Sequence, residues 1–278
     1  MQRRPLSLLP ALWALPLLAV GPVLPASVPV GVNLVVAPTR LVLEGRERAT
    51  EVLVINGGDQ PATFRISLTN LEMEEDGQMR ALQGPPGGHS SEPFIRFTPR
   101  QVTLAAGASQ TVRIQVRKPE NLAPGEYRCH MLFQGVPPPE TVRPEPRDAG
   151  RLSVDVRAVY GLTMPLIVRH GATHASVALS GLQHVASRDQ HYATLQIHRE
   201  GNRSTYGDLV ATWHPEGGKP IPAGRVNGLA VYAGLPLRKV ALELSLPSGR
   251  PLKGGTLKVA YLEHAGTKVL ATATLALP

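Results

Sequence analysis

The feature that most constrains this chain is a stretch in which apolar and polar residues alternate, residues 151–169. Its even-numbered positions are all apolar: Leu152, Val154, Val156, Ala158, Tyr160, Leu162, Met164, Leu166 and Val168. The odd-numbered positions at its start are polar. Strict alternation is typical of a half-buried β-strand, because successive side chains point to opposite faces of a sheet. The stretch therefore predicts a long strand.

The length of this strand is unusual. At 3.3 Å per residue it would span about 60 Å, whereas most strands end after five or six residues. It either breaks, at Gly161 or Pro165, or continues past its own domain. Pro165 has no N–H to donate, which suits an edge strand or a bulge. A long apolar edge aggregates unless something covers it. Two interpretations follow: an ordinary strand that crosses between two sandwiches, or a strand lent to another protein.

Composition predicts an all-β protein. A length of 278 residues suggests two domains of ordinary size. Val, Leu and Thr are abundant, and the 27 Gly and 27 Pro are scattered as turn residues. No convincing amphipathic helix follows the N-terminus, so we expect many short strands.

The N-terminal segment, residues 1–26, resembles a secretory signal. Arg3 and Arg4 precede an apolar stretch, and Ala26 is a plausible cleavage position. An uncleaved anchor is the alternative. The exported chain would work in an oxidising compartment, yet its single cysteine, Cys129, allows no intrachain disulfide. We therefore expect its stability to come from packing.

Charge and motifs exclude several classes of function. The formal charge of +8 falls to +6 once Arg3 and Arg4 are removed, and the basic residues are scattered, so we expect no nucleic-acid binding. The histidines lack the spacing of a metal site, and we expect neither a metal nor a cofactor. No P-loop, nucleophile elbow or His-Glu-x-x-His motif is present, so we expect no enzyme.

Strand-like segments organise the chain into two predicted domains. The first, residues 27–169, has candidate strands at 35–43, 51–56, 62–71, 94–98, 101–104, 111–117 and 127–135, followed by 151–169. Residues 72–91 read as a hairpin loop or insertion, and 136–150 as a proline-rich loop. The second, residues 170–278, has candidate strands at 175–179, 192–199, 205–213, 229–233, 239–246, 255–262 and 268–277. The count is typical of two immunoglobulin-like β-sandwiches, and the short junction predicts that they pack at a fixed angle.

Several stretches in order resemble the PapD-like periplasmic chaperones of chaperone–usher pathways. They are PTRLVLEG (38–45), PFIRFTPRQVTLAAGASQTVRI (93–114), NLAPGEYRCHMLFQGVP (121–137), the proline-rich loop with its alternating strand, and YGDL (206–209). No single motif is specific, but the ordered set covers most of the mature chain.

This resemblance implies a function for the long strand. Such chaperones work in the periplasm without ATP, bind pilus or fimbrial subunits by donor-strand complementation and deliver them to an outer-membrane usher. A subunit lacks the last strand of its own sandwich, and the chaperone supplies one. By resemblance, the donated residues here are Leu152, Val154, Val156, Ala158 and Tyr160.

The resemblance also implies basic residues that anchor the C-terminal carboxylate of the subunit. Arg40 matches the first of them. Pro165 stands where the family has a lysine, so Arg157 or Arg169 is the candidate substitute. Arg169 otherwise matches an arginine with an interdomain role, and Arg113 matches a structural arginine.

A secreted structural or adhesin-like component of a surface fibre is the alternative function. A fibre subunit would be expected to carry a free N-terminal donor segment and often a disulfide. Here the alternating strand is internal and there is one cysteine. The open apolar edge also leaves room for self-association of the free chaperone.

Overall fold

The computed structural model describes residues 33–82, 88–137, 159–187, 190–246 and 252–278. The predicted signal, residues 1–26, lies outside these ranges, as do the first four predicted donor residues: Leu152, Val154, Val156 and Ala158. Among the described residues the regular elements are strands, with one 3-10 turn at Glu92–Phe94. No helix in this part of the chain is long and apolar enough to cross a membrane.

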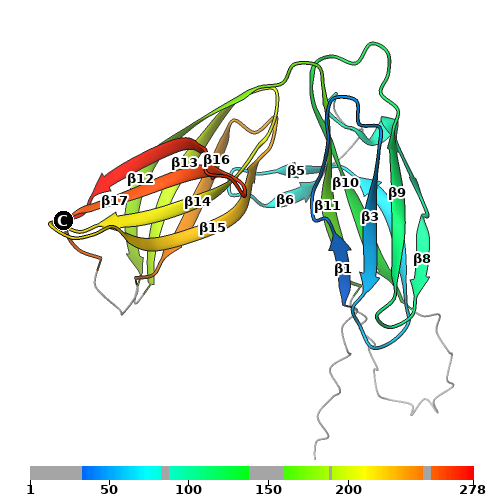
Figure 1. Ribbon diagram of the computed structural model, residues 1–278, viewed down its shortest axis with the longest axis horizontal. Helices are drawn as coiled ribbons and strands as arrows, with labels where there is room; N and C mark the ends of the chain where they lie inside the picture. The colour runs from blue at the N-terminus through cyan, green and yellow to red at the C-terminus, as the bar shows by residue number, and fades with distance from the viewer. Residues whose placement is uncertain (1–32, 83–87, 138–158, 188–189, 247–251) are drawn as a thin grey trace, which may run out of the picture. The chain divides into compact units, whose positions relative to one another are not determined.

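The first β-sandwich is built from the strands that precede residue 171 (Figure 1). They are β1 (Leu34–Ala37), β2 (Leu41–Leu43), β3 (Ala49–Asn56), β4 (Ala62–Thr69), β7 (Ile95–Thr98), β8 (Gln101–Leu104), β9 (Ser109–Val116), β10 (Gly125–Val136) and β11 (Gly161–His170). One sheet has the order β1-β3-β9-β7 and the other β2-β11-β10-β4-β8. A separate hairpin, β5 (Leu71–Met73) with β6 (Met79–Ala81), follows β4, as the polar segment 72–91 predicted.

Alternating side chains of both sheets fill the core of this sandwich. Phe64 and Phe133 from one sheet and Ile114 from the other are fully buried. Burial alternates along β3, β9 and β7, as expected for sheets with one face turned to a core. Cys129 is buried in the same core, and burial raises the pKa of its thiol to about 11.

The prediction of a single strand over residues 35–43 is wrong. The segment forms two strands in different sheets: β1 pairs antiparallel with β3, and β2 pairs parallel with β11. Pro38, between them, has no N–H for a ladder. The chain therefore changes sheets here, and β2 covers only a short part of the β11 edge.

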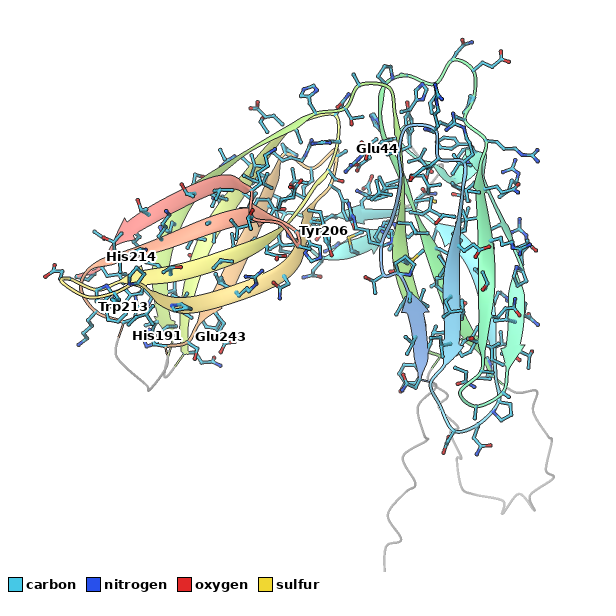
Figure 2. All side chains as sticks on the ribbon, viewed as in Figure 1. Glu44, His191, Tyr206, Trp213, His214 and Glu243 are labelled. Carbon is cyan, nitrogen blue, oxygen red and sulfur yellow. The ribbon has the colours of Figure 1, made fainter. Side chains whose placement is uncertain are left out.

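The second β-sandwich confirms the seven strands predicted after residue 170, with longer bounds for several. They are β12 (Ala175–Ser187), β13 (Gln190–Gly201), β14 (Thr205–His214), β15 (Ile221–Val231), β16 (Leu237–Leu244), β17 (Thr256–Glu263) and β18 (Val269–Ala276). The sheets have the orders β12-β13-β16 and β15-β14-β17-β18. Leu209, Trp213 and Tyr261 lie in the core between them. Figure 2 shows Tyr206 and Trp213 toward opposite ends of β14.

Candidate binding site along β11

Strand β11 pairs antiparallel with β10 from Gly161 to His170 without a shift in register, so of the alternatives that the sequence left open, a break at Pro165 is wrong. The N–H of Gly135 donates to the carbonyl of Tyr160 (3.0 Å). Because the backbone groups of successive residues point to opposite sides of a strand, even-numbered residues of β11 face β10 and odd-numbered ones face away. Pro165 is odd-numbered, and its missing N–H therefore costs no bond to β10.

The other edge of β11 is only partly covered. Its parallel pairing with β2 involves Leu166, Ile167 and Val168 alone. Within the described ranges, residues 161–165 have no strand partner on that side. Just before them, Val159 is 49% exposed and Tyr160 is 59% exposed. The edge thus presents backbone groups of odd-numbered residues beside exposed apolar side chains.

The alternation runs further than this sandwich needs. Met164, Leu166 and Val168 are fully buried in the core, and Leu162 packs against it. Tyr160 has the same phase but projects beyond the core, next to a cavity of about 220 Å³ that Leu34 and Phe64 also line. The even-numbered residues from Leu162 onward therefore complete this sandwich, and Tyr160 is the first that does not.

Arg40, the predicted anchor, lies between β1 and β2 and is half-buried. Its guanidinium donates to the hydroxyl of Ser204 (3.3 Å). The guanidinium carbon stands 4.5 Å from the ring centroid of Tyr206 and 5.7 Å from that of Tyr232. These are cation–π distances, so both rings stabilise the positive charge.

Arg40 lines an open pocket of about 510 Å³ in which cations outnumber acids. Arg169, Arg203 and Lys268 line it as well, and Glu263 is the acidic residue of the lining. Within the part of the chain that the structure describes, no carboxylate lies within salt-bridge distance of Arg40, Arg203 or Lys268. An anion of modest size suits such a pocket.

Arg169, unlike the other cations of this pocket, already has carboxylate partners among the described residues. It forms ion pairs of 3.2 Å with Glu44 and with Glu126. The Glu126 side chain is only 1% exposed and also accepts hydrogen bonds from the backbone N–H (3.0 Å) and hydroxyl (2.8 Å) of Ser204. This buried cluster ties β10 and β11 to the loop before β14. Sequence reasoning missed Glu126 and Ser204; the available signal was a carboxylate directly before Tyr127, at the start of β10.

The position opposite Pro165 carries no positive charge. His130 occupies it on β10 and is 3% exposed. Burial lowers the pKa of His130 to about 3, so its imidazole is neutral, and its Nδ1 has no partner among the described residues. Arg157, the other candidate substitute, lies outside the described ranges.

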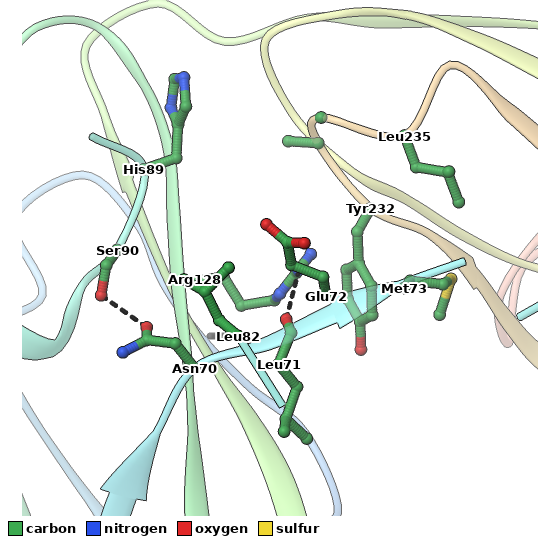
Figure 3. Close-up of a pocket in the computed structure, with 12 residues that line it drawn as sticks. Asn70, Leu71, Glu72, Met73, Leu82, His89, Ser90, Arg128, Tyr232 and Leu235 are labelled. Atoms are coloured by element: carbon green, nitrogen blue, oxygen red, sulfur yellow. Dashed lines mark hydrogen bonds between the residues drawn. The ribbon is translucent and has the colours of Figure 1, made fainter. Parts of the chain in front are cut away.

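Arg128, two residues before His130, presents a cation on the same face of β10. Its guanidinium carbon lies 3.7 Å from the ring centroid of Tyr232, and the group donates to the carbonyl of Leu71 (3.1 Å). It lines a second pocket, of about 330 Å³, beside Glu72 and Tyr232 (Figure 3). Burial lowers the pKa of Arg128. The charge balance differs from that of the Arg40 pocket, because one arginine and one glutamate line this pocket, whereas three arginines and a lysine accompany a single glutamate there.

Arg113 has a peripheral role in the described fold. It pairs with Glu51 across β3 and β9 (3.2 Å), with side chains that are 77% and 59% exposed. Exposed pairs of this kind contribute little to stability. Residues 33–82, 88–137, 159–187, 190–246 and 252–278 contain no group of three metal-ligating side chains.

Comparison with known proteins gives two kinds of match. Solved structures similar to this chain include the CupB2 chaperone of Pseudomonas aeruginosa (13% identity, 88% of this chain and 100% of that chain, TM-score 0.43). Another is the CsuC–CsuE chaperone–tip adhesion subunit pre-assembly complex of Acinetobacter baumannii (14% identity, 87% of this chain and 97% of that chain, TM-score 0.47). A third is the Salmonella enterica SafA pilin in complex with the SafB chaperone (16% identity, 88% of this chain and 96% of that chain, TM-score 0.43).

The family model of the pili and flagellar-assembly chaperones, PapD N-terminal domain, matches residues 33–169. A comparison with curated protein sequences finds no match. The matched range contains the first sandwich except His170, the last residue of β11, and includes Arg40 and β10. The chain therefore belongs to the PapD-like family of pilus-assembly chaperones, whose N-terminal domain is the first sandwich described above.

Proposed function

We propose that this protein is a periplasmic chaperone that captures pilus or fimbrial subunits by donating a strand and passes them to an outer-membrane usher. The family match supports the chaperone role. The predicted signal at residues 1–26 supports export to the periplasm. The function is one of binding, with no chemical step.

The observation that carries the proposal is the partly uncovered edge of β11. An extended segment of another protein can add to this edge, because residues 161–165 offer backbone groups that no described strand uses. The donated strand would run from Tyr160 back through Ala158, Val156, Val154 and Leu152. Its even-numbered side chains would fill an open groove in the subunit.

The interactions of a donated strand suit the binding of subunits that differ in sequence. Backbone hydrogen bonds give an affinity that tolerates sequence differences, whereas the alternate side chains select the register. Burial of one such side chain contributes about 1.5–3 kcal/mol. The loss of one donor residue should therefore weaken capture, and the fold should survive because Tyr160 is exposed.

The pocket around Arg40 supports a role in anchoring the subunit's C-terminal carboxylate. Hydrogen bonds between a guanidinium and a carboxylate are charge-assisted and stronger than neutral ones. Arg203 and Lys268 line the same pocket. They offer the second cation that Pro165 cannot supply, and they come from the second sandwich.

The test is a pull-down from the periplasm of the host with the tagged mature chain, followed by mass spectrometry. The wild type should retain a small β-rich subunit. A Val156→Asp, Tyr160→Asp double variant should lose it while its circular dichroism stays unchanged. Val185→Asp is the matched control, because Val185 is an exposed apolar residue (41%) on β12.

Each result has a definite meaning. Retention of the same subunit by both wild type and double variant would show that β11 is only a connecting strand. Recovery of the wild-type chain in the fibre itself, in amounts equal to the subunits, would favour the structural or adhesin-like alternative.

A further inference from the structure

The ring of Tyr206 contacts the guanidinium of Arg40 and also the imidazole of His264, which belongs to a second group of interacting residues. The Tyr206 ring lies 4.5 Å, centroid to centroid, from the imidazole of His264. The Nδ1 of His264 lies 2.7 Å from the carboxylate of Asp208. Asp208 also accepts from the guanidinium of Arg225 (2.7 Å) and from the N–H of Gly228 (2.9 Å). The aromatic ring is therefore fixed through His264 to a buried carboxylate.

The backbone around this cluster is shaped to make room for the Tyr206 ring. The pairing of β14 with β15 shifts register between Gly207 and Leu209, where Asn227 and Gly228 of β15 lie opposite the single residue Asp208, which marks a β-bulge on β15. Gly228, in the bulge, has φ +67°, and a Cβ there would come within 2.6 Å of the Tyr206 hydroxyl. Glycine allows both the left-handed backbone and the close approach of the ring. Bulge and glycine together seat Tyr206 beneath Arg40.

The Asp208 carboxylate keeps its negative charge within this cluster. The hydrogen bond from His264 and the backbone N–H of Gly228 lower the pKa of Asp208 to about 2. The carboxylate is 3% exposed and ionised at any physiological pH. His264 thus keeps its partner, and its ring keeps its orientation against Tyr206.

We propose that Tyr206, held by His264 and Asp208, is the positioning residue that orders Arg40 for an incoming carboxylate. This inference rests on the proposed anchor function of Arg40. An arginine side chain loses considerable rotamer freedom when it binds. A ring that already holds the guanidinium removes part of that cost before the ligand arrives. The second sandwich thereby prepares a binding residue that belongs to the first.

The first experiment measures the order of Arg40 without any client. In ¹⁵N-labelled mature protein, the Nε–H signal of Arg40 is assigned by its loss in Arg40→Lys. Its order parameter should be that of an ordered group in the wild type and should fall below about 0.6 in Tyr206→Leu. Tyr206→Phe should retain the wild-type value, because the hydroxyl takes no part in stacking. Tyr192→Leu, on β13, is the matched control.

The second experiment measures affinity for the subunit identified in the pull-down, by calorimetry. Arg40→Ala should weaken binding by about 10-fold to 100-fold, the loss expected for a charge-assisted bond. Tyr206→Leu should weaken it by about tenfold or less, and Tyr206→Phe should bind as the wild type does. The double variant Arg40→Ala, Tyr206→Leu should bind no more weakly than Arg40→Ala alone, because Tyr206 acts through Arg40.

The two experiments separate the two ideas. Unchanged order of Arg40 in Tyr206→Leu would overturn the positioning role, whatever the subunit does. Losses that multiply in the double variant would overturn it as well. A fall in order with no effect of Arg40→Ala on binding would refute the anchor itself, and with it the purpose assigned to Tyr206.

Discussion

Removal of the Arg169 charge should destabilise the protein far more than removal of the Arg113 charge. Arg169→Met keeps the length of the side chain but removes the ion-pair partner of the Glu126 carboxylate. That carboxylate is 1% exposed, and one of its oxygens, Oε1, already has no partner among the described residues. A buried charge that loses its partner typically costs about 3–5 kcal/mol. The hydrogen bonds from Ser204 remain, so we expect a loss near the lower limit, about 3 kcal/mol.

Urea unfolding of the mature chain measures this loss. With a slope of about 2 kcal/mol per M, a loss of 3 kcal/mol lowers the midpoint by about 1.5 M. Circular dichroism reports on both sandwiches, and the fluorescence of Trp213 reports on the second. Because Glu126 binds Ser204 as well as Arg169, both probes should show the shift.

Two further variants decide whether the reasoning holds. Arg113→Met breaks only an exposed pair and should cost less than about 1 kcal/mol. The double variant Arg169→Met, Glu126→Gln should recover more than half of the loss, because no buried charge remains. A midpoint for Arg169→Met as close to the wild type as that of Arg113→Met would refute the argument.

Three further predictions concern single groups. Cys129 should resist a thiol reagent at pH 8 in the native protein and react in urea, because burial raises its pKa to about 11; rapid native labelling would contradict its burial. The pKa of His130 is about 3 in the folded protein, against an ordinary value of 6.5, so His130 should lower the free energy of unfolding of the wild type as the pH drops below 6.5. The pKa of Asp208 is about 2 in the folded protein, against an ordinary value of 3.8, so the stability that Asp208 contributes is lost only as the pH drops below 3.8. The free energy of unfolding, measured from pH 7 to pH 2, should therefore depend less on pH than in the wild type near pH 5 for His130→Phe and near pH 3 for Asp208→Asn. The same pH dependence in wild type and variants would refute these assignments. Pro165→Lys should leave the urea midpoint nearly unchanged, because the restored N–H faces away from β10, and a large loss would show that this orientation is wrong.

Much of the fold followed from local pattern. The strict alternation over residues 151–169 predicted β11, and its even-numbered residues from Leu162 onward do face the core. The seven strands of the second sandwich were predicted from short apolar runs between turns. Period-two patterns are local, so a sequence displays them before any partner strand is known. The order of motifs also predicted the family whose sequence model matches residues 33–169.

The site residues depended on contacts between distant segments, which no local pattern contains. Glu126 and Ser204 are 78 positions apart, and Arg40 and Ser204 are 164 apart. The division of residues 35–43 into two strands likewise depended on which sheet each half joined.

The sequence by itself determined that the chain is all-β, that it contains one unusually long alternating stretch, and that Arg40 matches a family position. Only the tertiary structure decided which edge of β11 stays uncovered, why Pro165 is tolerated, and that Tyr206 lies beneath Arg40. The physical reason is that side-chain periodicity is a property of neighbouring residues, whereas pairing and charge compensation arise only when remote strands meet.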